Sequence, residues 1–433
     1  MVPIGSQLPR ALAFWLVAAV LALLLFASGA PSPLYVTYQQ AWHFSPLALT
    51  AVYAANALSL LVTLLFVGSL SDHLGRRPVL LAAVLVELGS MLLFAEARGL
   101  AWLFAGRIVQ GVATGAATGA LSAALIDLQP AGSRLGALVT NAASAGGLAV
   151  GALCAGLLVA YGPAPTRLVF WLLVTAFDAA LPLLAVLPET VRPDGGWRRT
   201  LRPELAVPPA VRGAFTALLP SVVASWALAG LYLSLGGSLV RSVLHLHSLL
   251  AGGLVIVALQ GTSAVVAVAA RDWSVRRSLL VGPVALILGV ALAMPALRTG
   301  SAALFFLGSA VAGVGFGPSF SGALRTLTAL APADRRAEVV TAVYVASYLA
   351  LSLPAVAAGL AVSHVGLTTT ATWYGAAVCV LEAVALLGTL RRREAAATGA
   401  AASPAPAQAE PALPVTGPGC AAPCPRTLAA QSH

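Results

Sequence analysis

The sequence predicts an all-α integral membrane protein whose twelve transmembrane helices form two pseudo-symmetric six-helix bundles. Three observations lead to this class. Hydrophobic residues make up 59% of the 433-residue chain and charged residues only 9%, which leaves too few polar side chains to cover a water-facing surface. Long apolar runs recur along the chain, and about 20 apolar residues suffice for one bilayer crossing. The two halves of the sequence also repeat each other.

Arginine, proline and glycine break the apolar runs and so mark the expected helices. In the first half we expect spans at Leu12–Ala30, Leu47–Leu70, Val79–Ala97, Leu100–Leu128, Leu135–Tyr161 and Leu168–Leu187. In the second half we expect them at Ala214–Val240, Leu249–Ala270, Leu279–Leu297, Ala302–Leu330, Val339–Val362 and Thr369–Leu390.

The composition between and after these spans sets the expected domain boundaries. An N-terminal six-helix bundle covers residues 1–188, a polar, proline-rich cytoplasmic loop covers 189–212, and a C-terminal bundle covers 213–393. Residues 394–433 are mostly alanine, proline and glycine, so we expect a disordered cytoplasmic tail. The first apolar run is longer than the hydrophobic core of a signal peptide, and we expect it to be retained as a span.

The arginines give the orientation. All 24 basic residues are arginine. Eighteen fall in segments on the side of the amino terminus, four fall in the opposite loops and two fall within spans. Positive residues concentrate in cytoplasmic loops, so an even number of spans places both termini in the cytoplasm. The arginines are scattered between apolar runs and form no basic stripe, which argues against a nucleic-acid partner.

An internal repeat relates the two halves. Three residues after the second span recur at an offset of 200 after the eighth span: Asp72, Arg76 and Arg77 as Asp272, Arg276 and Arg277. Parallel repeats of this kind rock against each other and typically hold a substrate near the bilayer midplane.

The loop after the second span is the most specific stretch of the sequence. From Gly68 it reads GSLSDHLGRRP. Gly68 permits close helix contact and Gly75 permits a tight turn. Asp72 can cap a helix or face the positive end of a neighbouring one, while Arg76 and Arg77 lie at the level of the cytoplasmic headgroups.

This string resembles the signature loop of the major facilitator superfamily, which also lies between the second and third spans. The resemblance covers about residues 10–393 and implies the fold of that superfamily. It implies that the loop latches the two halves on the cytoplasmic side in the outward-open state. An acid at the cytoplasmic end of the fourth span often joins this latch, and Asp127 occupies that place. Asp272 and Arg276 are the counterparts in the second half.

The fourth span carries a charge about seven residues from its start. Burying Arg107 in hydrocarbon costs about 2.5–3.5 kcal/mol on insertion scales. At helical spacing it shares one polar or small stripe with Gln110, Gly111, Thr114 and Thr118. The segment resembles the superfamily's Arg-x-x-Gln-Gly motif, whose arginine is implicated in proton coupling or in binding substrate charge. In that interpretation Arg107 faces a water-filled cavity or a partner; in the alternative it bonds helix-end carbonyls and is structural.

The fifth span contains closely spaced glycines at Gly147, Gly151 and Gly156. They resemble the motif of drug/proton antiporters, in which a proline follows the second glycine. Ala152 replaces that proline and Ala155 replaces a glycine, which leaves the antiport direction open. Small residues still permit close helix packing.

Sparse polar residues are the other candidates for a substrate cavity: Asn56, Thr118, Asn141, Ser225, Gln260, Tyr344 and Tyr348. A mostly apolar lining suits a small amphipathic or aromatic compound better than a sugar. The acids Glu87, Asp178 and Glu382 fall on spans that lie outside the central cavity in the resembling fold. An intramembrane acid is a functional candidate by default, but these positions favour a protonated or hydrogen-bonded structural role.

We therefore expect a secondary transporter of the bacterial inner membrane that works by alternating access. It resembles bacterial drug-efflux members and would export small amphipathic, drug-like compounds, with protons as a candidate coupling ion. The first alternative is metabolite uptake by symport or facilitated diffusion, and a second is a non-transporting receptor. All six histidines fall in loops or the tail, so we expect no catalytic residue, no metal and no cofactor. The expected partners are a small-molecule substrate and the lipid bilayer, with the chain as a monomer.

Overall fold

The computed structural model describes residues 8–133, 135–192, 205–246 and 248–402. Within these ranges, twelve helical segments are long and apolar enough to cross a membrane, and the described secondary structure is helical throughout. This confirms the predicted all-α, twelve-span class. The described residues up to Leu390 form one compact unit, and a second unit begins at Arg391.

Among its described residues, the first half has seven main helices and one short helical turn. They are α1 (Arg10–Gly29), α2 (Pro31–Trp42), α3 (Pro46–Val67), α4 (Ser71–Leu74), α5 (Arg76–Ala95), α6 (Leu100–Leu128), α7 (Leu135–Tyr161) and α8 (Leu168–Ala185). The expected end of the first span at Ala30 is wrong, because α1 and α2 together make one long span. Pro31 takes the first helical position of α2, where a missing N–H breaks no helical hydrogen bond.

The second half repeats this order. Its elements are α10 (Pro209–Ser242), α11 (Leu249–Ile256), η1 (Val257–Gly261), α12 (Thr262–Ala269), α13 (Val275–Thr299), α14 (Ala302–Leu330), η2 (Ala333–Arg335), α15 (Arg336–Val365) and α16 (Leu367–Ala402). The eighth span is α11 to α12, which are joined by the π-helical turn η1.

The last helix corrects the expected start of the tail. We expected the last span to end at Leu390 and disorder from residue 394, but α16 runs to Ala402. The extra turns are rich in alanine, the strongest helix former. Residues 403–433 and residues 193–204 of the central loop lie outside the described residues.

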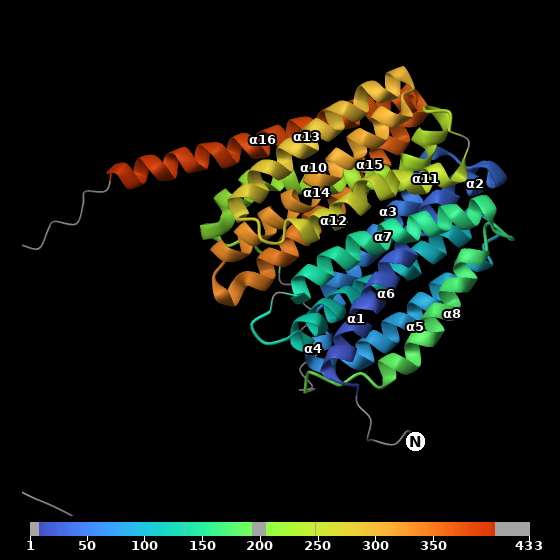
Figure 1. Cartoon of the computed structure of the whole chain (residues 1–433), viewed down its shortest axis with the longest axis horizontal. Coiled ribbons are helices and arrows are strands. Elements are labelled where there is room, and N and C mark those ends of the chain that lie inside the picture. Colours follow the sequence, from blue (N-terminus) through green and yellow to red (C-terminus); the bar gives the residue numbers. More distant parts are fainter. Residues whose placement is uncertain (1–7, 134, 193–204, 247, 403–433) are drawn as a thin grey trace, which may run out of the picture. The chain divides into compact units, whose positions relative to one another are not determined.

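The pairing of spans across the two halves follows the repeat (Figure 1). The second span, α3, packs against the eleventh, α15. The fifth span, α7, packs against the eighth, formed by α11, η1 and α12. Exchanging the halves turns one pair into the other, because the second and eighth spans are counterparts, as are the fifth and eleventh. The interface therefore has the pseudo-symmetry that the sequence repeat predicts.

Small residues bring the halves together at the end away from the signature loop. A Cβ at Gly253 of α11 would lie 2.5 Å from the carbonyl oxygen of Ala152 in α7. One at Gly359 of α15 would overlap Thr50 of α3. Any side chain at these glycines would push the helices apart. The halves are therefore closed against each other at this end.

Candidate functional site

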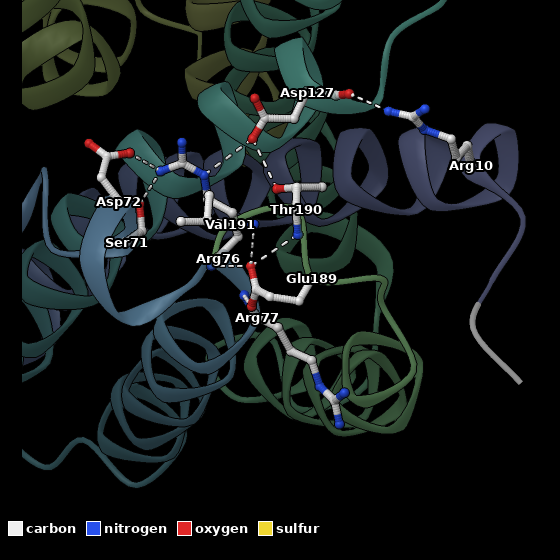
Figure 2. Close-up of polar contacts among 9 residues, drawn as sticks. All are labelled: Arg10, Ser71, Asp72, Arg76, Arg77, Asp127, Glu189, Thr190 and Val191. Atoms are coloured by element: carbon white, nitrogen blue, oxygen red, sulfur yellow. Dashed lines mark hydrogen bonds and ion pairs between the residues drawn. The ribbon is translucent and has the colours of Figure 1, made fainter. Parts of the chain in front are cut away.

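The signature loop forms a polar network around Arg76, whose side chain is only 10% exposed (Figure 2). Its guanidinium donates to Ser71 Oγ at 2.6 Å and to Asp127 Oδ2 at 3.4 Å, and it pairs with Asp72. The hydroxyl of Thr190 donates to the same oxygen of Asp127 at 3.0 Å. The structure thus brings together three of the residues that the sequence placed in the gate: Asp72, Arg76 and Asp127.

Glu189 is the network member that the sequence analysis missed. Its Oε1 accepts the backbone N–H of Arg76 at 2.8 Å, and its Oε2 accepts that of Arg77 at 3.0 Å. A carboxylate at the positive end of a helix both satisfies unpaired N–H groups and interacts favourably with the helix dipole. Glu189 therefore caps α5 from 113 residues away. The available signal was an acid directly after the sixth span.

Gly75 is required by this cap. Its backbone has φ +98° and ψ 153°, a conformation that is essentially restricted to glycine. A Cβ at this position would also lie 2.6 Å from Oε2 of Glu189. Gly68, at the end of α3, makes a close contact with α6. A Cβ at Gly119 of α6 would lie 2.8 Å from the carbonyl oxygen of Gly68, so the two helices approach closely there.

The counterpart loop of the second half is arranged differently. Asp272 pairs with the exposed Arg271 at 3.3 Å, and Arg276 is exposed. The guanidinium of Arg277 lies 4.3 Å from the ring centroid of Trp273. Both residues that we expected to extend the gate, Asp272 and Arg276, therefore lie at the surface. The partners described for Arg76 lie in the first bundle and at Glu189, where the central loop begins, so in this conformation the network braces the first bundle.

Arg107 forms a second network, inside the first bundle. Its side chain is 0% exposed. Nε donates to the hydroxyl of Tyr35 at 2.5 Å, and Nη1 donates to the carbonyl of Ser28 at 3.0 Å and to Oε1 of Gln110 at 2.6 Å. The sequence analysis expected a water-filled cavity or a partner, and the structure shows polar partners from α1, α2 and α6 around the guanidinium. The carbonyl of Ser28, in the last turn of α1, is the kind of partner that the structural alternative requires.

Gln110 connects Arg107 to a carboxyl group. Its amide nitrogen donates to Oε1 of Glu87 at 3.1 Å and to the carbonyl of Ala27 at 3.1 Å. Glu87 lies on α5 and is fully buried. The sequence analysis separated Glu87 from the functional stripe, and the structure joins them through one amide. The link was not visible in the sequence because it depends on the rotation of α5 against α6.

The rest of the α6 stripe packs against α3. A Cβ at Gly111 would overlap Ser59 Oγ and the carbonyl oxygen of Asn56. Thr114 is buried, and the hydroxyl of Thr118 donates to its carbonyl at 2.6 Å. Gly111 is therefore a close-contact residue, which explains the glycine after Gln110 in steric terms.

Two of the expected cavity residues belong to an aromatic cluster, which we define as Trp226 of α10, Phe320 of α14 and Tyr344 and Tyr348 of α15. The ring centroids of Trp226 and Tyr348 are 5.0 Å apart, and those of Trp226 and Phe320 are 5.3 Å apart. All four side chains are half-buried. Trp226 and Tyr348 pack against a buried core that includes Tyr53 of the first bundle and Ala229 and Leu351 of the second. Trp226 and Phe320 were missed because the cluster is assembled from three distant spans.

Three further expected cavity residues lie in different surroundings. Gln260 lies in the π-helical turn η1, and its buried Oε1 has no hydrogen-bond partner among the described residues. Asn141 is exposed. Ser225 instead donates to Glu382 at 3.3 Å, so its hydroxyl is directed to α16 and not to a central cavity.

The glycines of the fifth span serve two contacts. A Cβ at Gly147 would lie 2.5 Å from the carbonyl oxygen of Ala22 on α1, and one at Gly151 would overlap the backbone of Phe26. A Cβ at Gly156 would lie 3.4 Å from the Cα of Leu250 on α11, in the other half. The fifth span thus joins the first span to the second bundle.

Comparison with known proteins decides the family. The family model described as Major Facilitator Superfamily matches residues 17–353. The chain belongs to the major facilitator superfamily. It is therefore a membrane transporter of that superfamily and not an enzyme.

Solved structures of superfamily members share the fold. A bacterial homologue of the human lysosomal transporter Spinster, in an inward-facing and unoccupied conformation, is 12% identical with a TM-score of 0.71, covering 89% of this chain and 98% of the other. The nucleoside transporter NupG is 13% identical with a TM-score of 0.68, covering 88% and 100%. The human organic anion transporter MFSD10 is 19% identical with a TM-score of 0.59, covering 88% and 100%.

One curated relative matches over part of its length. Citrate exporter 1 of Aspergillus niger is 34% identical over 135 residues, which are 30% of this chain. The chain spans about a quarter (25%) of the length of that relative.

Proposed function

We propose that this superfamily member exports small amphipathic, drug-like organic compounds across a bacterial inner membrane by alternating access, with protons as the coupling ion. The observation that carries the proposal is the aromatic cluster. Its four half-buried rings come from three spans of the second bundle, and two of them, Trp226 and Tyr348, contact a buried core formed by residues of both bundles. Offset and edge-to-face rings bind an aromatic or apolar body, and such a site needs few polar groups to fix orientation. The buried Nε1 of Trp226 has no described partner and offers one donor.

A negatively charged group on the substrate would suit the same region. The described salt bridges of the chain do not include Arg107, so no carboxylate side chain neutralises it directly in this structure. Its guanidinium lies 5.7 Å from the ring centroid of Tyr53, in the core against which the aromatic cluster packs. The partial likeness to a citrate exporter also supports an organic acid and outward transport.

Alternating access requires the loop side to close when the opposite end opens. Asp72 keeps 52% of its side chain exposed while it pairs with Arg76. It is therefore accessible to the second half, as the latch of the superfamily requires. We place this loop and both termini in the cytoplasm because the arginines are concentrated there. We also keep the division into two six-helix bundles joined by a central loop, and the monomeric state, as part of this proposal.

The proposal is tested by compound accumulation in an efflux-deficient bacterial host. The wild-type chain is expected to lower accumulation of aromatic amphiphiles, including aromatic acids, more than that of sugars. Trp226→Ala is expected to lose this effect, whereas Trp102→Ala, which changes an exposed tryptophan, is expected to keep it. If no compound responds, or if Trp226→Ala exports like the wild type, the proposal fails.

The second candidate is metabolite uptake by symport or facilitated diffusion. It is favoured by Ala152, which stands in the uninterrupted helix α7 where drug/proton antiporters have proline. Membrane vesicles of both orientations separate the candidates. Export predicts substrate accumulation in inside-out vesicles under a proton gradient, and uptake predicts it in right-side-out vesicles.

A further inference from the structure

We propose that Glu87 is the proton-carrying group of this transporter and that it acts on the conformation through Gln110 and Arg107. The inference rests on the proposed function for its place in a transport cycle, but it concerns a residue that the proposal does not use. It is carried by four features: a buried carboxyl with one free oxygen, an amide bridge, a guanidinium with one free nitrogen, and the contacts which that guanidinium makes.

The carboxyl of Glu87 is only partly satisfied. Its side chain is 0% exposed, Oε1 accepts from Gln110, and Oε2 has no hydrogen-bond partner among the described residues. A buried polar group without a partner is unfavourable, and a buried charge is far more so. The present environment of Glu87 therefore fits the neutral acid better than the carboxylate.

The amide of Gln110 lies between the carboxyl of Glu87 and the charged guanidinium of Arg107. Its Oε1 accepts from Nη1 of Arg107 while its Nε2 donates to Glu87. Nη2 of Arg107 has no partner among the described residues. One amide thus separates the unpaired oxygen of Glu87 from the unpaired nitrogen of Arg107. Hydrogen bonds between ionised groups are roughly twice as strong as neutral ones, so an ionised Glu87 would compete with Gln110 and Tyr35 for the guanidinium.

The guanidinium of Arg107 links the protonation state of Glu87 to the contact between the halves. Arg107 bonds Ser28 at the end of α1 and Tyr35 in α2. The next residue of α2, Val36, lies against the other half of the molecule. Its Cγ2 is 3.1 Å from the position that a Cβ at Gly237 of α10 would take. Movement of Arg107 toward Glu87 would release the segment of the first span that touches the second bundle.

The proton balance is simple. The neutral carboxyl loses one proton to water on the side to which the network opens, and the resulting carboxylate pairs with Arg107. Uptake of one proton from the opposite side breaks that pair and restores the bonds from Arg107 to α1 and α2. No other reactant is consumed.

Few other charges face Glu87. From α6 the groups are Arg107 and, through its amide, Gln110. From α8, which also packs on α5, Asp178 is exposed on the outside of the helix. The charges of α5 itself and of α4 lie near the helix ends: Asp72, His73, Arg76 and Arg77 at one, and Glu96, which follows α5, at the other.

Glu382 provides a matched control in the second bundle. It is also 0% exposed, but both of its oxygens have partners. Ser221 donates to Oε2 at 2.8 Å and Ser225 donates to Oε1 at 3.3 Å. None of the hydrogen bonds described for Glu382 comes from an arginine. A neutral glutamine at this position removes a buried carboxyl without touching the Arg107 network.

The test needs no substrate. Spin labels are attached at Ala131 and Ala333, which are exposed in the loops after the fourth and tenth spans, in a background without the four native cysteines. Label-to-label distances are measured in lipid nanodiscs by double electron–electron resonance across a series of buffers from acidic to alkaline. The wild-type chain is expected to shift between two distance populations, and Glu87→Gln is expected to stay in one. Glu382→Gln is expected to shift like the wild type.

Two further variants address folding and rescue. Glu87→Asp keeps a carboxyl and is expected to restore the pH response with a displaced midpoint. Gln110→Leu removes the bridge but no titratable group and is expected to abolish the response in chains that still elute as a single species. A response retained in Glu87→Gln, a response absent from the wild type, or an equal loss in Glu382→Gln would overturn the inference. Failure of the compound panel alone would refute the proposed export and leave this distance measurement as a separate result.

Discussion

At the scale of single residues, three hydrogen bonds to polar protein groups stabilise the buried charge of Arg107. An arginine in hydrocarbon costs about 2.5–3.5 kcal/mol on insertion scales. Hydrogen bonds to a charged group contribute about 1.5–3 kcal/mol each. Arg107 makes three, to Tyr35, Ser28 and Gln110, so the network offsets the insertion cost. The same bonds join three helices, which gives this residue a structural role beside any role in transport.

Removing the hydroxyl of Tyr35 tests how much the hydrogen bonds of Arg107 contribute to stability. Tyr35→Phe leaves Nε of Arg107 buried without an acceptor, and we expect the free energy of unfolding to fall by about 1–3 kcal/mol. Thermal unfolding of the detergent-purified chain measures the change. Tyr344→Phe is the control, because no hydrogen bond is described for the Tyr344 hydroxyl. Equal melting temperatures for Tyr35→Phe and the wild type would show that the bond contributes nothing to stability.

The cap of α5 gives a second prediction at this scale. Glu189→Ala removes the acceptor of the two backbone N–H groups of α5, those of Arg76 and Arg77, and loss of a helix cap typically costs about 0.5–2 kcal/mol. We expect faster amide hydrogen exchange in the first turn of α5. Ser274→Ala is the matched control, since Ser274 accepts from the N–H of Arg277 and caps α13 locally. If exchange at Arg76 and Arg77 is unchanged in Glu189→Ala, the remote cap does not operate.

At the scale of elements, glycines set how closely the helices approach. A Cβ at Gly111 would overlap Ser59 and Asn56 of α3, whereas a Cβ at Gly89 of α5 would meet nothing within 4 Å. Both glycines lie inside helices, where alanine is intrinsically better by about 0.8–1.0 kcal/mol. The difference in stability between alanine variants at these two glycines therefore measures the packing contact of Gly111.

We expect the two alanine variants to differ in sign. Gly111→Ala should lower the melting temperature because α3 and α6 must separate, and Gly89→Ala should leave it unchanged or raise it. Both are measured by thermal unfolding in one detergent. A Gly111→Ala chain as stable as the wild type would mean that α3 and α6 are not in tight contact at this level.

The elements also show what the sequence could predict. Both bounds of α6, α7 and α14 were predicted, because arginine, proline or glycine flank those apolar runs. The continuation through Pro31 was not, because a proline that starts a helix and one that ends a span look alike in the sequence. The turn η1 was not predicted either, because nothing in Val257–Gly261 distinguishes a π-helical turn from the α-helix on either side.

Some residues of the candidate sites were predicted from the sequence and others were not. The gate residues Asp72, Arg76 and Asp127 were predicted from one contiguous string and its usual partner. Glu189 was not, because its target is 113 residues away. The link from Glu87 to Arg107 and the aromatic cluster depend on helix rotation and on packing between distant spans, which composition and spacing do not encode.

At the scale of the whole molecule, the interface between the two halves is pseudo-symmetric. The contacts between α3 and α15 and between α7 and α11 are counterparts in the repeat, and small residues make both of them close. Small residues at a helix interface permit close packing without interlocked side chains. Such a contact can separate and reform as one bundle rocks against the other.

A disulfide across this interface tests the motion directly. A Cβ at Gly156 would lie 3.4 Å from the Cα of Leu250, which is close enough for a bridge between the two positions. In a background without native cysteines, Gly156→Cys with Leu250→Cys is expected to cross-link on oxidation. The cross-linked chain is expected to stop transport in either direction, because the end away from the signature loop can no longer open. Reduction should restore the rate, and each single-cysteine variant should be insensitive to oxidant. Full transport by the cross-linked chain would mean that the halves do not separate at this contact, and alternating access through it would have to be abandoned.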